Sequence, residues 1–395
     1  MNIYADNAAT TALSAAAKKA MLPFWDQIYG NPSSLHSAGQ AAKEALEKAR
    51  AAIASLLNAK PEEIYFTSGG TEADNQAIRS AAYWGARKGK RHLVSTRFEH
   101  HAVLHTLKRL EQDGFEVTLL DVHSRGIVDP EELRQAIRED TALVSIMFAN
   151  NEIGTLQPIG EIGAICRENG IPFHTDAVQA AGHVPLDVQA LSVDLLSLSA
   201  HKFHGPKGIG ALFARKGTPI SSLLEGGAQE RGKRPGTENL PAIMGMAAAL
   251  SEACQKMDRH AAAVSALRDR LIEILSRIPH CRLNGDRNQR LPGILNFCFE
   301  GIEGESLLLL LDDRGIAASS GSACTSGSLD PSHVLLSLGL PHEIAHGSLR
   351  LSLSAHNTPE EIETIGAAVA QTVEYLRSIS PVWEALEKGE KEHVI

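Results

Sequence analysis

The sequence predicts an α/β fold in which a mostly parallel sheet is flanked by helices and accompanied by a smaller α+β domain. Apolar strand patterns alternate with amphipathic helical patterns, as is typical of a parallel sheet covered on both faces. A chain of 395 residues with 43% hydrophobic residues can bury one large core and one smaller core. We therefore expect a large domain over residues 15–255 and a small domain formed by residues 1–14 and 256–395.

The individual elements follow from the spacing of apolar residues. Helical spacing first appears at Leu46, Ala49, Ile53 and Leu56. Short apolar runs typical of buried strands occupy residues 63–66, 117–120, 142–147, 171–176 and 193–198. Long helical patterns follow at residues 240–254, 259–278 and 359–376. Between the strands and these helices, the glycine-rich stretch 225–236 predicts a long functional loop.

The segment Ser199–Gly208 places one lysine among histidines and glycines, directly after the apolar run 193–198. Lys202 should therefore emerge at the end of a buried strand. A lysine in a crowded pocket, with a depressed pKa, is the nucleophile that Schiff-base chemistry on an aldehyde cofactor requires. The alternative for Lys202 is an ordinary solvated cation at a strand end.

Asp176 ends the preceding apolar run and lies 26 residues before Lys202, which leaves room for one crossover. In a parallel sheet both residues open onto the same crevice at the carboxyl ends of the strands. An aspartate there could keep a pyridine nitrogen protonated and so make the ring an electron sink. The alternative for Asp176 is a turn or a helix cap.

The turn Ser68–Thr71 follows strand 63–66 and opens a helix that continues through Ile78. Its glycines permit close backbone approach, Thr71 can cap the helix, and the free N–H groups favour a phosphate. The turn lacks the lysine of a Walker loop and the third glycine of a dinucleotide fingerprint, so neither nucleotide motif fits.

With lysine, aspartate and phosphate turn in this order, the chain resembles the pyridoxal-phosphate enzymes of fold type I, and within them the NifS-type cysteine desulfurases. The matching segments cover nearly the whole chain: residues 4–11 (YADNAATT), 30–34 (GNPSS), 99–100 (EH), 150–154 (NNEIG), 234–239 (RPGTEN) and 319–327 (SSGSACTSG).

The resemblance implies a role for each matching residue. Lys202, Cys324 and His100 would be catalytic, and His100 would also stack on the cofactor ring. Asp176 would pair with the ring nitrogen, and Asn151 and Gln179 would bond the ring oxygen. The phosphate would be held by Gly70, Thr71, Ser199 and His201, with Thr237 reaching it from the neighbouring subunit of a homodimer. The substrate carboxylate would be bound by Asn31 and Arg350, the latter through its guanidinium fork.

Cys324 lies in a run of small polar residues that cannot pack a core, so we expect a mobile surface loop on the small domain. Cys166, Cys254 and Cys298 lie in apolar segments and are predicted to be small buried hydrophobes, while Cys281 is ambiguous. The resemblance implies that L-cysteine gives L-alanine and a persulfide on Cys324, whose sulfur then goes to iron–sulfur cluster or other thio-cofactor assembly. It implies no stably bound metal, although Cys324 could contact a partner's iron–sulfur cluster.

Composition excludes several classes of protein. A net charge of −9, from 38 basic and 47 acidic residues, argues against nucleic acid or anionic membrane as a partner. No apolar run approaches membrane-spanning length, and the first residues lack the features of a signal peptide. Five cysteines without framework spacing indicate a reducing compartment, and we expect a cytoplasmic protein. The charged segment 387–393 predicts a solvated tail.

Other functions stay open at this stage. A selenocysteine lyase or an aminotransferase of the same fold would share the lysine, aspartate and phosphate turn, and only Cys324 separates them. A metal-dependent hydrolase built on His100, His101, His201 and His204 is disfavoured, because their spacing differs from HExxH and no carboxylate partner is obvious. The sequence does not identify the sulfur acceptor.

Overall fold

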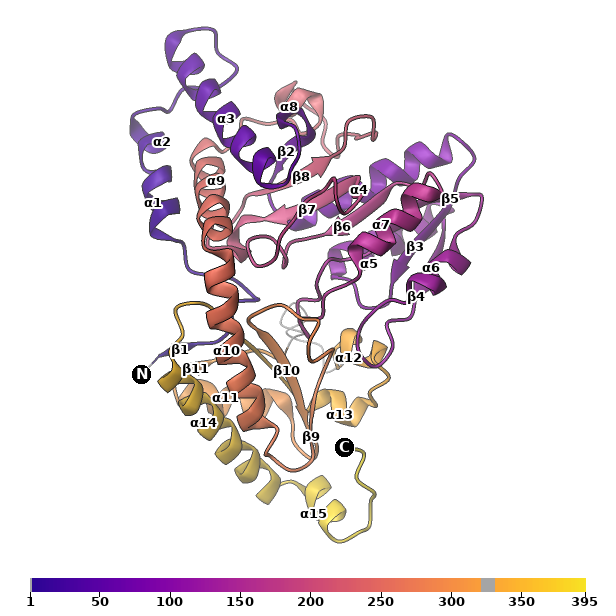
Figure 1. The fold of residues 1–395 in the computed structure, drawn as a ribbon, viewed down its shortest axis with the longest axis vertical. Helices are drawn as coiled ribbons and strands as arrows, with labels where there is room; N and C mark the ends of the chain where they lie inside the picture. Colours follow the sequence, from indigo (N-terminus) through magenta and orange to yellow (C-terminus); the bar gives the residue numbers. More distant parts are fainter. Residues whose placement is uncertain (1, 321–330) are drawn as a thin grey trace.

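The computed structural model describes residues 2–320 and 331–395. Its centre is a seven-stranded sheet with the order β2-β8-β7-β6-β5-β3-β4 (Figure 1). The strands are β2 (Ile64–Thr67), β3 (His92–Thr96), β4 (Glu116–Leu120), β5 (Thr141–Ser145), β6 (Phe173–Asp176), β7 (Leu195–Ser199) and β8 (Gly210–Ala214). The strands from β7 to β4 pair in parallel, and only β8 runs antiparallel to its two neighbours.

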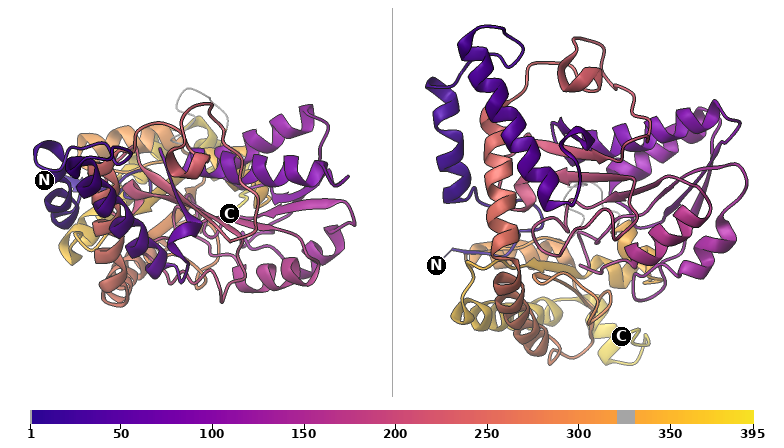
Figure 2. Two further views of the ribbon diagram at one scale, coloured as in Figure 1. Left: turned by 90° about the horizontal axis from the view of Figure 1, so that it is seen from above. Right: turned by 45° about the horizontal axis from the view of Figure 1, so that its top comes forward.

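Helices cover both faces of this sheet, as predicted (Figures 1 and 2). They are α1 (Ala15–Met21), α2 (Pro23–Asp26), α3 (Ser37–Leu56), α4 (Gly70–Ala86), α5 (His101–Gln112), α6 (Pro130–Ala136), α7 (Ile159–Glu168), α8 (Gln229–Gly232) and α9 (Leu240–Gln255). Two single-turn 3₁₀ helices, η1 (Pro61–Glu63) and η2 (Ala200–Lys202), complete this part. The glycine-rich stretch 225–236, predicted as a loop, contains the short helix α8.

The second part is built around a three-stranded antiparallel sheet with the order β12-β10-β9. Its strands are β9 (Cys281–Leu283), β10 (Ile294–Phe299) and β12 (Ser348–Ser352), and the short strands β1 (Ile3–Tyr4) and β11 (Ile316–Ala317) pair in parallel beside them. The helices are α10 (Met257–Leu275), α11 (Gly304–Asp313), α12 (His333–Ser337), α13 (His342–His346), α14 (Pro359–Ser378) and α15 (Pro381–Glu387). Only Lys256 separates α9 from α10, so one long helical rod joins the two parts (Figure 1).

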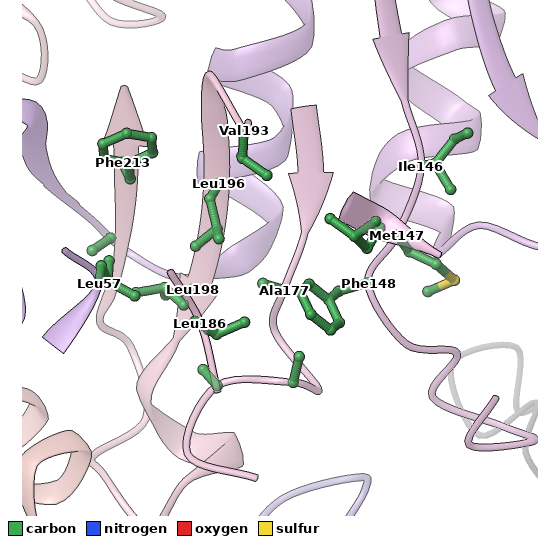
Figure 3. Close-up of a cluster of buried hydrophobic side chains, with 14 of the residues drawn as sticks. Leu57, Ile146, Met147, Phe148, Ala177, Leu186, Val193, Leu196, Leu198 and Phe213 are labelled. Carbon is green, nitrogen blue, oxygen red and sulfur yellow. The ribbon is translucent and has the colours of Figure 1, made fainter. Parts of the chain in front are cut away.

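The large core lies between the seven-stranded sheet and its helices. Figure 3 shows a section of it, in which Phe213 on β8, Leu196 on β7 and Ile146 just after β5 belong to one buried cluster. All three are fully buried. A second cluster fills the space between β10, β12, α10 and α14, around Phe297, Leu351 and Ile365. Rigid packing on both faces fixes where each strand of the large sheet ends, and those ends position the site.

The cysteine predictions are largely confirmed. Cys166 and Cys298 are buried, whereas Cys254 is only partly buried. Cys281 is also partly buried and donates from Sγ to the Leu275 carbonyl oxygen at 3.3 Å. Burial raises the pKa of the Cys298 thiol to about 12, which keeps it protonated and unreactive at neutral pH.

None of the helices in the described parts of the chain has the length and apolar character needed to cross a membrane. The tail of residues 388–393 is exposed, as predicted, but it is not merely solvated, because His393 Nδ1 lies 2.8 Å from a carboxylate oxygen of Glu300.

Candidate active site

The parallel pairing of β6 with β7 brings Asp176 and Lys202 to one edge of the large sheet, as the sequence predicts. Asp176 is the last residue of β6, and Lys202 ends the 3₁₀ turn that follows β7. The Lys202 amine donates to the main-chain oxygens of Ala8 at 2.6 Å and Ala9 at 2.9 Å. The N-terminal segment therefore crosses this edge and holds the lysine side chain.

Asp176 is buried among other ionisable groups. One donor or acceptor atom from each of Asp74, His100 and Asp176 lies within 4.8 Å of the other two. Burial, and then the neighbouring Asp74 carboxyl, raise the pKa of Asp176 to about 7, although the Val178 N–H bond at 2.9 Å opposes this shift. Burial likewise raises the pKa of Asp74 to about 7. Two carboxyl groups thus share one dry pocket below His100.

His100 caps the N-terminus of α5, and its Nδ1 accepts a hydrogen bond from the Ala102 N–H at 3.1 Å. In the neutral ring Nδ1 therefore carries the lone pair and Nε2 carries the proton. Burial, with a further contribution from the positive charge of Lys202, lowers the pKa of His100 to about 4. The ring is consequently neutral at physiological pH.

The predicted phosphate residues meet in a cavity of about 360 Å³ at the N-terminus of α4. Gly70, Thr71, Ser199 and His201 all line it. It is further lined by Thr10, Ser68, Gly69, Glu72, Lys207 and Gly208. His201 is oriented by the Thr10 hydroxyl, which lies 3.1 Å from its Nδ1.

This cavity suits the phosphate of pyridoxal phosphate in three respects. Its lining offers hydroxyl groups, helix N–H groups and the cation of Lys207, the donors that a phosphate anion requires. Close packing at Gly70, where an ideal Cβ would lie 2.6 Å from Val178 Cγ2, leaves no room for a larger residue at the start of the helix. Buried Asp176 provides an acidic group of suitable basicity for a ring nitrogen at the adjoining strand end.

Gln179 and Thr237 lie near this cavity but do not line it. Gln179 donates from its amide to the Ala8 oxygen at 2.9 Å, the same oxygen that accepts from Lys202. Thr237 is exposed and lines a separate cavity of about 220 Å³, which shares Ser68 and Gly208 with the phosphate cavity. Both residues are therefore close to the site, while their expected contacts with a cofactor stay predictions.

Arg350 lies on β12, at the boundary between the two parts of the molecule. It is 2% exposed, and its guanidinium donates to Asp6 Oδ1 at 2.8 Å and to the Asn151 main-chain oxygen at 3.1 Å. Its Nε has no hydrogen-bond partner within the described residues. A buried donor left unpaired in this way is suited to an incoming carboxylate.

Asn31 does not join Arg350 within one chain. The connection between α2 and α3, which carries Asn31, lies at the end of the molecule opposite β10 and its partner strand β12 (Figure 1). Asn31 Oδ1 instead accepts from the Ser33 N–H at 2.9 Å and shapes its own turn.

Cys324, the predicted sulfur acceptor, falls outside the described residues.

The sequence analysis missed two participants. Asp74 lies on α4, three residues after Thr71, and only its buried position reveals it as the neighbour of Asp176. Asp6 belongs to the quoted N-terminal motif, and its pairing with Arg350 depends on the bridge between Asp6 and Ser352.

Comparisons with known proteins address the family to which the chain belongs. The family model described as aminotransferase class-V matches residues 3–365. The chain is 56% identical to "Cysteine desulfurase IscS" of Methanosarcina thermophila over 380 residues, which are 96% of this chain and 94% of that protein. A solved structure of a NifS-like protein superposes with a TM-score of 0.89 at 39% identity, covering 95% of this chain and all of that one.

A structure of SspA in complex with cysteine superposes with a TM-score of 0.80 at 35% identity and covers 90% of this chain and all of that one. The chain therefore belongs to the class-V aminotransferase family and, within it, to the cysteine desulfurases, which are pyridoxal-phosphate-dependent enzymes.

Proposed function

We propose that this protein removes sulfur from free L-cysteine, giving L-alanine and a persulfide on Cys324. The observation that carries the proposal is the convergence of Lys202, Asp176 and His100 at one strand edge, beside a cavity suited to phosphate. The SspA structure with bound cysteine supports the choice of substrate by similarity.

The residues that would hold the cofactor are Gly70, Thr71, Ser199 and His201 for the phosphate, Asp176 for the ring nitrogen, Asn151 and Gln179 for the ring oxygen, and His100 above the ring face. Pyridoxal phosphate, when bound, supplies an aldehyde that condenses with an amine and a ring that accepts electrons from the substrate. The neutral state of His100 suits a ring-stacking role, because a second cation there would oppose a protonated ring nitrogen.

Lys202 would carry the proton transfers at the substrate carbons. Its amine is held at the carbonyl oxygens of Ala8 and Ala9, at the edge where Asp176 also emerges. A primary amine can take the substrate Cα proton and later return a proton to Cβ, which completes alanine. Arg350 would bind the substrate carboxylate through its unpaired Nε.

Sulfur transfer would then occur between two thiol groups. The Cβ–S bond of the substrate breaks, a sulfur–sulfur bond forms on Cys324, and the bond electrons and a proton remain on the carbon. Free cysteine and the Cys324 thiol are thereby converted to alanine and a Cys324 persulfide, with every atom accounted for. The persulfide would pass its sulfur to an acceptor protein, such as an iron–sulfur scaffold.

We further propose a cytoplasmic homodimer in which Thr237 of one subunit approaches the phosphate site of the other, and Asn31 can serve the substrate only across such an interface. The proposal also keeps the two predicted domains, a large one over residues 15–255 and a small one formed by residues 1–14 and 256–395. Partly buried Cys254 and Cys281 are free thiols, which fits a reducing compartment.

The test is to incubate the purified enzyme with L-cysteine and to measure alanine and sulfide in the presence of a reductant. Cys324→Ser should lower both rates roughly 100-fold or more, because the sulfur loses its acceptor. Cys281→Ser is the matched control and should keep the parent rate. An aminotransferase would instead give a keto acid, and a selenocysteine lyase would act on selenocysteine and leave cysteine unchanged; either result contradicts the proposal.

The visible spectrum tests the lysine separately. The parent should absorb in the visible range when it contains pyridoxal phosphate, and Lys202→Ala should alter or lose that band. A parent protein that remains colourless after pyridoxal phosphate is added would exclude the assignment.

A further inference from the structure

A second cluster of ionisable side chains lies in the small domain, away from the active site. Among the described residues, only two groups place three such donor atoms within 4.8 Å of one another. One is the active-site group Asp74, His100 and Asp176, and the other is His280, Glu300 and His393. The second group joins the start of β9 and the end of β10 to the tail of the chain, near the C mark in Figure 1.

The donor atoms of this group converge on one carboxylate oxygen. Glu300 Oε2 lies 2.8 Å from His393 Nδ1 and 3.6 Å from His280 Nδ1. The Ile395 main-chain oxygen lies 2.8 Å from His280 Nδ1 and adds a fourth donor. Donor atoms around a tetrahedral Zn²⁺ ion, each about 2.1 Å from the metal, are separated by about 3.4 Å. The observed separations of the donor atoms are therefore near those of an occupied site, and binding would require a change in the orientation of the rings.

We infer that His280, Glu300 and His393 form a binding site for a divalent transition-metal ion such as Zn²⁺, with the Ile395 main-chain oxygen as a fourth ligand. Two imidazoles, one carboxylate and one carbonyl oxygen form a donor set that Zn²⁺ accepts. The ion takes the place of the two Nδ1 protons. In a neutral imidazole the proton moves to Nε2, so the ring stays uncharged.

The surroundings hold these ligands in place. Glu300 is 4% exposed, and its other oxygen, Oε1, accepts from the Val394 N–H at 2.7 Å, which leaves Oε2 directed at the two rings. Arg377 donates to the main-chain oxygens of His280 and Glu300, so it fixes the two segments that supply ligands. Such support from outside the ligand set orients a metal site and limits the rearrangement that binding needs.

The two rings are accessible from solvent and adjustable. His280 and His393 stack with their centroids 3.7 Å apart, and each side chain is 33% exposed. The lone pair of each Nδ1 lies in the plane of its ring, so two stacked rings direct their lone pairs along parallel planes. One ring must therefore turn before both nitrogens can bind the same ion. His393 lies on the tail, and this turn would replace its stacking on His280 with a bond to the ion. Metal binding would thereby fasten residues 393–395 to the end of β10.

The experiment uses the cofactor-loaded enzyme in a Cys324→Ser background, which removes a competing thiolate ligand. Zn²⁺ binding is measured by calorimetry in phosphate-free buffer, and Co²⁺ binding by visible absorption. We expect one ion per chain, and His393→Ala should weaken binding at least about tenfold. His342→Ala, on the exposed surface of α13, is the matched control and should bind as the parent does.

A second measurement locates the ion. Hydrogen exchange of the peptide covering residues 388–395 should slow in Zn²⁺ for the parent and for His342→Ala, but not for His393→Ala. Glu300→Gln should abolish the visible Co²⁺ bands while the tail remains attached through the Val394 N–H. The inference would be overturned if His393→Ala bound Zn²⁺ as tightly as the parent, or if Zn²⁺ did not change the hydrogen exchange of residues 388–395. The three side chains would then form only a hydrogen-bonded contact. The site is independent of the proposed function, so the failure of either leaves the other standing.

Discussion

Burial sets the acidity of Asp176, and the neighbouring Asp74 carboxyl adds to the effect. Each has its pKa raised to about 7, chiefly by burial. The folded cofactor-free protein therefore holds protons that the unfolded chain releases near pH 4. Since the native state binds more protons between about pH 4 and pH 7, its free energy of unfolding falls as the pH rises through that range.

Asp74→Asn should remove part of this pH dependence. The amide cannot ionise, so the variant avoids the cost of a buried charge at pH 8 and relieves the repulsion that acts on Asp176. We expect the advantage of the variant to be smaller at pH 5 and to grow by on the order of 1 kcal/mol or more at pH 8. Urea unfolding of the cofactor-free proteins at the two pH values measures this. Parallel pH curves would show that Asp74 does not carry a raised pKa in the folded protein.

Arg350 is the residue on which recognition of the substrate carboxylate should depend. Lysine keeps the charge but loses the planar fork and the Nε donor. Arg350→Lys should therefore raise the KM for cysteine about 10-fold to 100-fold, with little change in the visible spectrum of the bound cofactor. Steady-state kinetics and absorbance measure the two effects. Arg282→Lys, on β9 of the same sheet, serves as the control, and an equal rise in its KM would refute a specific role for Arg350.

At the scale of elements, the start of α4 can keep its position beside the strand ends only while Gly70 remains small. An ideal Cβ at this position lies 2.6 Å from Val178 Cγ2, closer than any stable carbon contact. Gly70→Ala should weaken pyridoxal-phosphate binding about tenfold, which corresponds to the lower range of overpacking costs. Fluorescence titration of the cofactor-free protein measures the affinity. Adding Val178→Ala should restore most of it, and failure to do so would place the cause outside this contact.

Sequence patterns predicted the helices and strands well, because burial decides both where apolar residues occur in the sequence and which face of each element packs. The run 142–147 became β5 at Thr141–Ser145, and the parallel pairing of β6 with β7 placed Asp176 and Lys202 together. The meeting of Asp74 with His100 could not be predicted in this way. These residues come from α4 and from the cap of α5, and their approach depends on the strand order of the large sheet. No local pattern in the sequence encodes that order.

The segment around α8 is held by a buried ion pair that sequence reasoning did not reveal. Arg50 Nη2 lies 2.6 Å from Glu230 Oε1, and Glu230 Oε2 also accepts from the Phe66 N–H at 2.8 Å. Glu230 itself adopts a positive φ of 47°, a conformation that costs a non-glycine residue energy. The ion pair therefore maintains a strained backbone on the segment that leads to Thr237.

Glu230→Gln should destabilise the protein by about 3 kcal/mol, because it leaves the Arg50 charge buried and poorly compensated. Glu47→Gln is the matched control, since Glu47 also contacts Arg50, at 3.3 Å, but is half exposed. It should cost less than about 1 kcal/mol. Urea unfolding compares the two variants. Equal losses would mean that burial of the pair is not what stabilises this segment.

At the scale of the whole molecule, one stretch of the chain, residues 22–35, exposes several large apolar side chains. Leu22, Trp25, Tyr29 and Leu35, on or between α1, α2 and α3, are between 65% and 93% exposed. Figure 1 shows α3 and α8 at the same end of the molecule, so this surface lies near the segment that carries Thr237. A cluster of large exposed apolar residues is typical of a protein interface. A second copy of the chain is the partner that would also bring Thr237 to a neighbouring phosphate site.

The double variant Trp25→Asp/Tyr29→Asp should therefore become monomeric, because buried charges at the centre of an interface oppose association. Light scattering after size-exclusion chromatography should give the parent twice the mass of the variant. The variant should remain folded by circular dichroism and bind pyridoxal phosphate less tightly, since each site would lose the Thr237 of its neighbour. Tyr375→Asp, exposed on α14, should stay dimeric. A parent that elutes as an active monomer would exclude a shared active site.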